Sequence, residues 1–172
     1  MDTFVAIASK RDWKRGFADR PVREEVERRI LDAGRLAGSA MNRQPWRFVV
    51  VVEDRELRER LAETVFAPSN VHGAPLVVAL VGRAGELPAF DAGRAAQNMF
   101  LAAWNEGVVS VPNGMPDRER TGQVLGVGDD EVVRIVLAFG YPARPADPGR
   151  RSPEEWSAAA NRRPLDELVD RR

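Results

Sequence analysis

Three nearly continuous apolar runs, each rich in valine, constrain the fold of this chain more than any other feature. They lie at residues 48–52, 75–81 and 132–139, and a shorter run lies at 108–111. A strand that is apolar on both faces has to be covered on both faces. Polar, helix-forming segments separate the runs, so we expect a mixed or parallel central sheet with helices on both sides.

The segments between the runs carry helical patterns. The clearest has one apolar stripe opposite its Arg and Glu side chains, made of Val22, Val26, Ile30, Ala33 and Ala37. We expect a second long helix at 90–105, whose many alanines permit close packing. Shorter helices are expected at 4–10, at 117–125, and from Asp54, as the N-cap, to about Val65.

The last thirty residues differ in character from the rest. A polar stretch rich in arginine and interrupted by prolines is followed by a small apolar patch, made of Leu165, Leu168 and Val169. We therefore expect one domain, with a core over 1–142 and an arm over 143–172 that runs over a surface. The apolar end of the arm either docks on a second subunit or is a frayed terminus.

Composition excludes several kinds of site. The chain has no cysteine, which rules out disulfides, thiolate catalysis and cysteine-bound metals. His72 is the only histidine, and a catalytic triad or a multi-histidine metal site would have to use it. We therefore expect no metal. The 26 basic and 26 acidic residues cancel, so we expect neither a nucleic acid nor a membrane as partner.

The N-terminal sequence, Met1 to Phe4, starts neither a basic stretch nor an apolar run. We therefore expect no signal peptide. The longest apolar run, Phe48 to Val52, is far shorter than the ~20 residues that cross a bilayer. The cytoplasm is the expected location.

Two segments carry candidate binding residues. Arg11 and Arg15 would lie on one side of a helix, where two guanidinium groups can bind a phosphate; the alternative is a solvated charged face. Residues 39–48 place a hydroxyl and the amides of Asn42 and Gln44 before a buried strand. Such groups suit a planar heterocycle, because amides both donate and accept hydrogen bonds; the alternative is a polar connection.

The two segments together resemble the N-terminal signatures of the nitroreductase family, in the same order. They read Arg11-x-x-x-Arg15-x-Phe17 and Ser39-x-x-Asn42-x-Gln44-Pro45-Trp46-x-Phe48. The similarity continues through Ala74-Pro75, the helix from near Asp91, Gly107 to Gly114, Gly140-Tyr141-Pro142, and Arg162 to Glu167. Nearly the whole chain is covered, and Asn-x-Gln-Pro-Trp is the most specific part.

The resemblance implies an α+β fold, the three-layer α/β/α sandwich of that family with a mixed central sheet. It also implies a homodimer with FMN bound non-covalently between the subunits, and a C-terminal arm that is exchanged with the partner. The FMN phosphate would be held by Arg11 together with Arg162 or Arg163. Arg15 would approach the pyrimidine edge of the flavin or its ribityl chain.

The resemblance places further residues at the flavin. Ser39, Ala40 and Asn42 would contact it from the other subunit. Backbone N–H groups near Asn113 and Gly114 would face the flavin N5 edge. The set also includes Asn70, Asp12 and Trp13; Trp13 stands where family members commonly have a serine, so it either removes a contact or points away.

By the same resemblance, FMN carries the chemistry and no protein side chain is catalytic. NAD(P)H would deliver hydride to flavin N5 and leave, and a nitroaromatic, a quinone or a similar small acceptor would then take the electrons. Positive groups near N1 and O2 would stabilise the reduced flavin.

Other functions stay open at this stage. The same fold could serve flavin breakdown, reductive dehalogenation or a deazaflavin cofactor, and a flavin-binding protein without turnover is a further alternative. The segment at 82–90 is shorter than in many family members, and that segment often shapes the substrate pocket. Neither the acceptor nor the choice between NADH and NADPH follows from the sequence.

Overall fold

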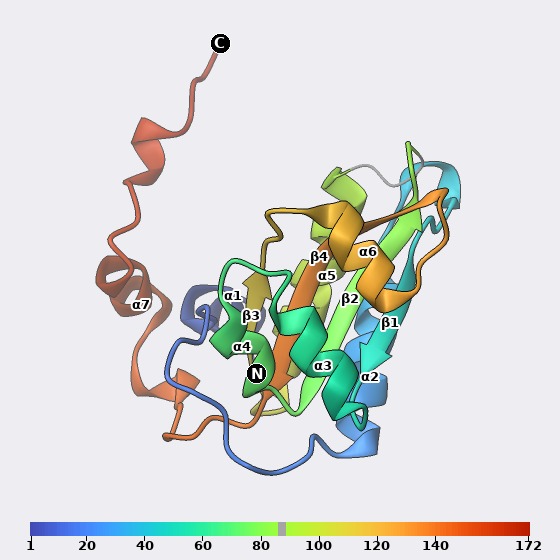
Figure 1. The fold of residues 1–172 in the computed structure, drawn as a ribbon. Coiled ribbons are helices and arrows are strands. Elements are labelled where there is room, and N and C mark those ends of the chain that lie inside the picture. Colours follow the sequence, from blue (N-terminus) through green and yellow to red (C-terminus); the bar gives the residue numbers. More distant parts are fainter. Residues whose placement is uncertain (86–88) are drawn as a thin grey trace.

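The computed structural model describes residues 1–85 and 89–172. Within these ranges one sheet has four strands, β1 (Arg47–Val51), β2 (Leu76–Arg83), β3 (Val109–Asn113) and β4 (Glu131–Gly140). Their order across the sheet is β1-β2-β4-β3 (Figure 1). The last strand in the sequence therefore occupies an inner position, and β1 and β3 form the edges.

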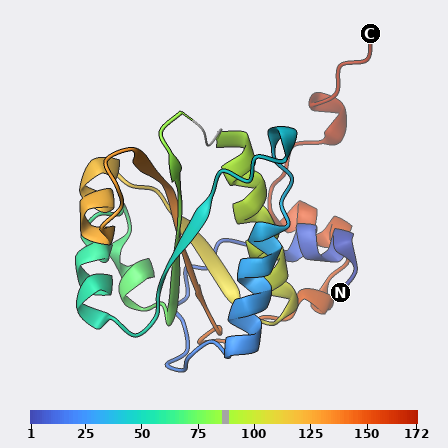
Figure 2. The ribbon, with the colours of Figure 1, turned by 90° about the vertical axis from the view of Figure 1, so that its right-hand side faces the viewer.

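Helices cover both faces of the sheet (Figure 2). One layer consists of α2 (Glu24–Arg35) and α5 (Ala89–Asn105). The opposite layer consists of α3 (Arg55–Ala62), α4 (Pro68–His72) and α6 (Arg118–Leu125). This confirms the three-layer α/β/α arrangement and explains why the strands are apolar on both faces.

Strand β2 shows how its sequence serves two cores. Leu76, Val78 and Leu80 belong to the cluster with the side chains of α2 and α5. The alternate residues Val77 and Ala79 belong to the second cluster, with the side chains of α3 and α4. Successive side chains of a strand point to opposite faces, so a doubly covered strand has to be apolar throughout.

The expectation of a mixed or parallel sheet is wrong for the strand pairs in the described ranges, which are all antiparallel. The helix α5 does connect two strands that run in the same direction, β2 and β3. They are not neighbours, however, because β4 lies between them and runs opposite to both. The alternation of strands and helices in the sequence correctly indicates the crossover from β2 to β3. The insertion of β4 between these two strands makes the pairing antiparallel.

The close contact of α2 with α5 depends on small residues. A Cβ added at Gly34 would lie 2.9 Å from side-chain atoms of Met99 and Phe48, so any larger residue there would force these packed side chains to shift. Ala95 and Ala103 are fully buried in the same cluster. The expected packing of the alanine-rich helix is confirmed.

The helix start expected from capping at Asp54 is also confirmed. The Asp54 carboxylate accepts a hydrogen bond from the Leu57 amide (2.8 Å) at the start of α3. That helix ends at Ala62 rather than near Val65. The short helices expected near the N-terminus and at 117–125 are α1 (Thr3–Ser9) and α6.

The N-terminal segment lies against the β3 edge. Asp12 and Ser110 form an isolated parallel bridge, and the Trp13 amide donates to the Ser110 carbonyl oxygen (3.0 Å). The preceding helix α1 is fixed by the Trp104 indole N–H, which donates to Ser9 Oγ (2.8 Å). Residues 11–15 are therefore held in place although they form no helix.

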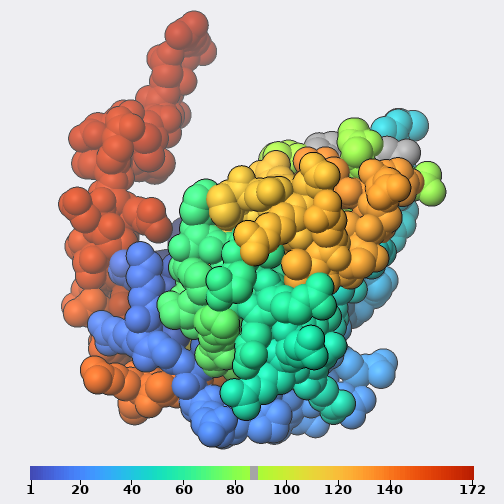
Figure 3. All heavy atoms as spheres, viewed as in Figure 1, coloured from blue at the N-terminus to red at the C-terminus, as the bar shows by residue number. Residues whose placement is uncertain are grey.

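The first half of the arm packs on its own chain, and the expectation that 143–172 wraps a partner stays a prediction. Its 3₁₀ turn η2 (Pro148–Arg150) and helix α7 (Pro153–Ala159) lie against α1, and Trp156 is 7% exposed. An aromatic residue inside the polar stretch supplies the apolar contact that the overall composition obscured. Beyond Ala160 the arm extends away from the rest of the molecule (Figure 3). Leu165, Leu168 and Val169 are exposed.

Candidate functional site

The predicted residues Arg11, Asp12, Trp13 and Arg15 line one cavity of about 330 Å³. The cavity lies between the N-terminal segment and the first half of the arm. Its other lining residues are Ser9, Lys14, Trp104, Pro145, Ala146, Asp147, Arg150, Arg151, Trp156 and Ala159. The two predicted arginines reach the same cavity from a loop, so the helical spacing that suggested them is not the reason they meet.

Trp156 is the centre of a cationic cluster in this cavity. The guanidinium carbons of Arg11, Arg150 and Arg151 lie 5.4, 5.0 and 5.1 Å from the centroid of its ring. Arg11 Nη2 also donates to the Trp156 carbonyl oxygen (2.8 Å). The indole N–H donates to the Pro148 carbonyl oxygen (2.9 Å), which fixes the ring. A guanidinium over an aromatic ring is favourable at such distances.

The lining of the cavity is strongly positive. Five cationic side chains face two carboxylates, and both carboxylates have other partners. Asp12 Oδ1 accepts from Lys10 Nζ (2.9 Å), and Asp147 Oδ1 accepts from the Gly149 amide (2.8 Å). In the described part of the chain, Arg11, Arg15, Arg150 and Arg151 form no ion pair.

Trp13 neither blocks this cavity nor leaves it. Its indole N–H donates to the Gly16 carbonyl oxygen (2.6 Å) across the loop, and its ring remains part of the lining. Nearby, Ser110 Oγ is buried and has no hydrogen-bond partner in the structure. An unpaired buried hydroxyl is costly, and this one lies in the residue that bridges to Asp12.

A second group of predicted residues lies at the C-terminal end of β3. Asn70 Nδ2 donates to Asn113 Oδ1 (2.9 Å), and Asn113 Nδ2 donates to the carbonyl oxygens of Val111 and Val136 (both 3.3 Å). The buried Asn113 side chain is thereby occupied, and it orients the half-buried Asn70. The backbone of Gly114 is held by its carbonyl oxygen, which accepts from the Phe66 amide (3.0 Å).

The third group, Ser39, Ala40 and Asn42, lies in a constrained loop that contains the 3₁₀ turn η1 (Ala40–Asn42). Met41, Asn42 and Gln44 all have positive φ angles, of 52, 54 and 49°. Such angles are uncommon outside glycine and persist where the surroundings fix them. Ser39 Oγ accepts from the Gln44 amide (2.9 Å), and the buried Asp91 carboxylate accepts from the Ala40 amide (3.4 Å).

One chain does not bring the three groups into a single pocket. The loop of Ser39, Ala40 and Asn42 precedes β1, at the far end of the molecule from α1 and α7 in Figure 1. Arg162 and Arg163 are exposed and lie outside the lining of the cationic cavity, and Arg163 Nε instead pairs with Glu167 (3.1 Å).

The sequence interpretation missed Arg150, Arg151 and Trp156. Twenty-six basic residues, nearly all of them arginine, made no single arginine distinctive. Trp156 offered a usable signal, because it is the only aromatic residue after Tyr141. An indole in a polar arm is expected to bury its apolar surface. Here the N-terminal helix and three arginines bury it.

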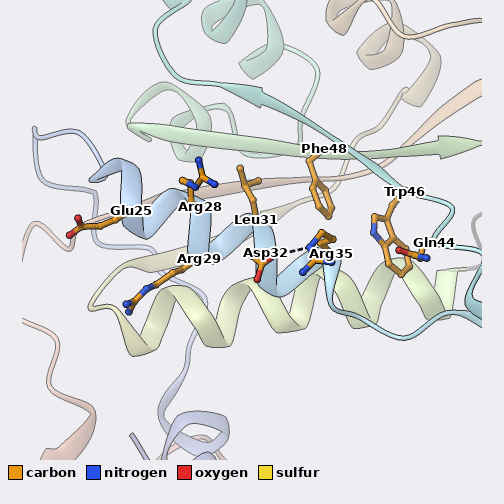
Figure 4. Close-up of a pocket in the computed structure, with 9 residues that line it drawn as sticks. All are labelled: Glu25, Arg28, Arg29, Leu31, Asp32, Arg35, Gln44, Trp46 and Phe48. Carbon is orange, nitrogen blue, oxygen red and sulfur yellow. Dashed lines mark hydrogen bonds and ion pairs between the residues drawn. The ribbon is translucent and has the colours of Figure 1, made fainter.

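Another groove lies elsewhere, along α2 and the start of β1 (Figure 4). It encloses about 870 Å³ and is lined by Trp46, Phe48 and charged residues of α2. Two of its arginines are already paired, Arg29 with Glu106 (2.6 Å) and Arg35 with Asp32 (2.7 Å). Among the described residues, Arg28 is the one arginine of the groove without an ion pair, against four such arginines in the cavity at Trp156.

One strongly shifted carboxyl group lies outside all three groups. Arg47 at the start of β1 donates from Nε and Nη2 to both oxygens of Glu131 (2.6 and 2.5 Å). These bonds, with a further one from the Gly128 amide, lower the pKa of Glu131 to about 2. The pair fastens β1 to the start of β4 across the sheet, and its role is structural.

Comparison with known proteins gives the family. The model of the Nitroreductase family matches residues 7–86 and 68–141. A Methanothermobacter thermautotrophicus protein named as an NADH dehydrogenase/NAD(P)H nitroreductase is 32% identical, over 91% of this chain and 88% of its own. The chain therefore belongs to the nitroreductase family.

Other relatives agree in sequence and in structure. The NADH dehydrogenase of Thermus thermophilus is 30% identical, over 90% of this chain and 94% of its own. A Desulfovibrio desulfuricans protein, named as a nitroreductase and solved in complex with FMN, has 28% identity and a TM-score of 0.82. That alignment covers 100% of this chain and 98% of the other. Among the described residues, no helix has the length and apolar character needed to cross a membrane.

Proposed function

We propose that this protein is an FMN-dependent oxidoreductase that passes electrons from NAD(P)H to nitroaromatic, quinone or similar small acceptors. It would act as a cytoplasmic homodimer with FMN at the subunit interface. The observation that carries the proposal is the cavity around Arg11. Five cationic side chains line it, and its four arginines form no ion pair with a carboxylate of the described chain. Family membership and an FMN-bound relative support the choice of ligand.

The residues of the cavity fit an FMN phosphate. Guanidinium groups bind a phosphate through parallel charge-assisted hydrogen bonds. Arg11 is half-buried and fixed by its bond to the Trp156 carbonyl oxygen, so its position does not have to be selected on binding. The unpaired Ser110 hydroxyl lies beside this segment, outside the lining of the cavity.

FMN, when bound, supplies the hydride chemistry. The chain would bind and orient it. Arg11 would hold the phosphate and Arg15 the ribityl or pyrimidine part, while Asp12 and Trp13 shape the wall. Asn70, oriented by Asn113, would donate to the pyrimidine end, and the backbone near Gly114 would border the reactive edge.

The partner subunit would supply Ser39, Ala40 and Asn42. In a single chain their loop is far from the cavity at Trp156 (Figure 1), yet its conformation is held by Ser39 and Asp91. A loop fixed in an uncommon conformation and exposed to solvent suits a contact made across an interface. Arg162 and Arg163, in the exposed end of the arm, would reach the partner's flavin in the same way.

Flavin content and its reduction test the proposal. The purified protein should be yellow, with about one FMN per chain, and NADH or NADPH should bleach the flavin in stopped-flow measurements. An acceptor such as a quinone should then restore the colour. Bound flavin that neither nucleotide bleaches would indicate a binding protein without turnover, and a colourless chain that takes up no FMN would refute the proposal.

A further inference from the structure

We propose that Arg150 and Arg151 complete the phosphate-binding pocket from the same chain as Arg11, with Trp156 as the platform that holds all three guanidinium groups. The inference rests on the proposed FMN site and assigns it two further residues. Neither lies in a segment that resembles a family motif. Their position depends on the first half of the arm, which packs on its own chain.

Geometry brings the three arginines around one indole ring. Arg11 comes from the segment beside β3, whereas the other two follow each other at the end of η2, about 140 residues later in the sequence. All three guanidinium carbons lie between 5.0 and 5.4 Å from the same indole centroid. The 7% exposure of Trp156 shows that the platform is closed over and not a loose surface contact.

The charges in the pocket call for an anion. Three guanidinium groups around one ring repel each other, and the cation–π contacts offset only part of that cost. In the described part of the chain, the acids of α7 form no ion pair with them. Glu155 Oε2 accepts from the Ser152 amide (2.8 Å) and Glu154 Oε2 accepts from Ser152 Oγ (2.8 Å), as part of the cap of that helix. Asp12 and Asp147, which do line the cavity, have the partners described above.

A phosphate monoester is the anion that fits best. It offers three terminal oxygens, one for each arginine, and a charge near −2. The cavity of about 330 Å³ accommodates a phosphate with part of its ribityl chain, but not a complete dinucleotide. Because riboflavin lacks the phosphate, the pocket distinguishes FMN from riboflavin.

The test compares flavins that differ only in the phosphate. Arg150→Gln/Arg151→Gln should bind FMN roughly tenfold to a hundredfold more weakly, since each charge-assisted contact contributes of the order of a tenfold change in affinity. Riboflavin affinity should stay within about twofold of the unmodified protein, as expected for a group that contacts only the phosphate. Both are measured by quenching of flavin fluorescence on the apoprotein. The matched control, Arg60→Gln/Arg118→Gln, removes two exposed charges from α3 and α6 and should change neither affinity.

A second measurement separates this inference from the proposed function. Inorganic pyrophosphate should change the tryptophan fluorescence of the apoprotein through Trp156, and the double Gln variant should lose that change. The pair Arg150→Lys/Arg151→Lys, which keeps the charge, should recover part of the FMN affinity and guards against a folding defect. FMN binding that is equally tight in the double Gln variant and the control would overturn the inference and leave the proposed function intact. A wild-type chain that responds to pyrophosphate but binds no FMN would overturn only the proposed function.

Discussion

Replacing Trp156 by alanine should release the arm without unfolding the core. The indole belongs to neither of the two core clusters of the described residues, so its loss acts on the arm and the N-terminal segment rather than on the core. Burial, one hydrogen bond of about 1 kcal/mol, and three cation–π contacts of about 0.5–1 kcal/mol each are lost together. Removing a buried tryptophan side chain costs roughly 3–5 kcal/mol in all.

That loss exceeds what α7 can tolerate. The helix has seven residues, and an isolated helix of this length is marginal in water even with a good capping box. Hydrogen exchange followed by mass spectrometry should show residues 153–159 nearly unprotected in Trp156→Ala. Protection in β2 and β4 should stay as in the unmodified protein. The FMN affinity of Trp156→Ala should also fall, because the phosphate pocket opens. Its riboflavin affinity should change little.

Trp156→Phe is the matched control. It keeps an aromatic ring but loses the N–H that donates to the Pro148 carbonyl oxygen, at a cost of about 1 kcal/mol. Helix α7 should then stay protected. Full protection of 153–159 in the alanine variant would show that the arm is held by other contacts, and the account of Trp156 as its anchor would be refuted.

Three further predictions follow from named contacts. Arg11→Ala should weaken FMN by roughly 1.5–3 kcal/mol and riboflavin much less; equal weakening in a titration would place Arg11 away from the phosphate. Truncation after Asn161 should abolish the dimer in sedimentation but leave α7 protected, whereas truncation after Tyr141 should also expose α1; a stable dimer without the exposed end would contradict its role. The folded-state pKa of Glu131 is lowered to about 2, below its ordinary 4.5, so its stabilisation is complete above 4.5 and is lost as the pH falls toward 2. The unfolding temperatures of the unmodified protein and Glu131→Gln should therefore converge over that window, and a constant difference would refute the assignment.

The layers of the fold could be predicted from the sequence, because a strand like 76–83 with no polar face has only one environment that suits it. The strand directions could not be predicted in the same way. The sequence of β4 itself does not indicate that this strand inserts between β2 and β3. Its position follows from the packing of the whole sheet. The family motifs indicated Arg11 and the Ser39 loop, and the structure adds what holds each of them in place.

The arm shows most clearly where sequence reasoning stops. Its average composition is that of a solvated segment. The single residue Trp156 nevertheless makes the first half of the arm pack on the rest of the chain. Arg150 and Arg151 could not be singled out, since their role depends on contacts with a segment at the other end of the chain. The exposed patch at Leu165, Leu168 and Val169 agrees with the sequence expectation, and its partner stays a prediction.

The inner position of β4 also has a consequence during protein synthesis. Strands β2 and β3 leave the ribosome with unpaired inner edges, because their common neighbour begins only at Glu131. At a translation rate of about 5–20 residues per second, the edge of β2 waits some seconds for β4 to appear. Exposed apolar edges of this kind invite pairing with other chains. We expect the nascent chain to depend on chaperones over this interval.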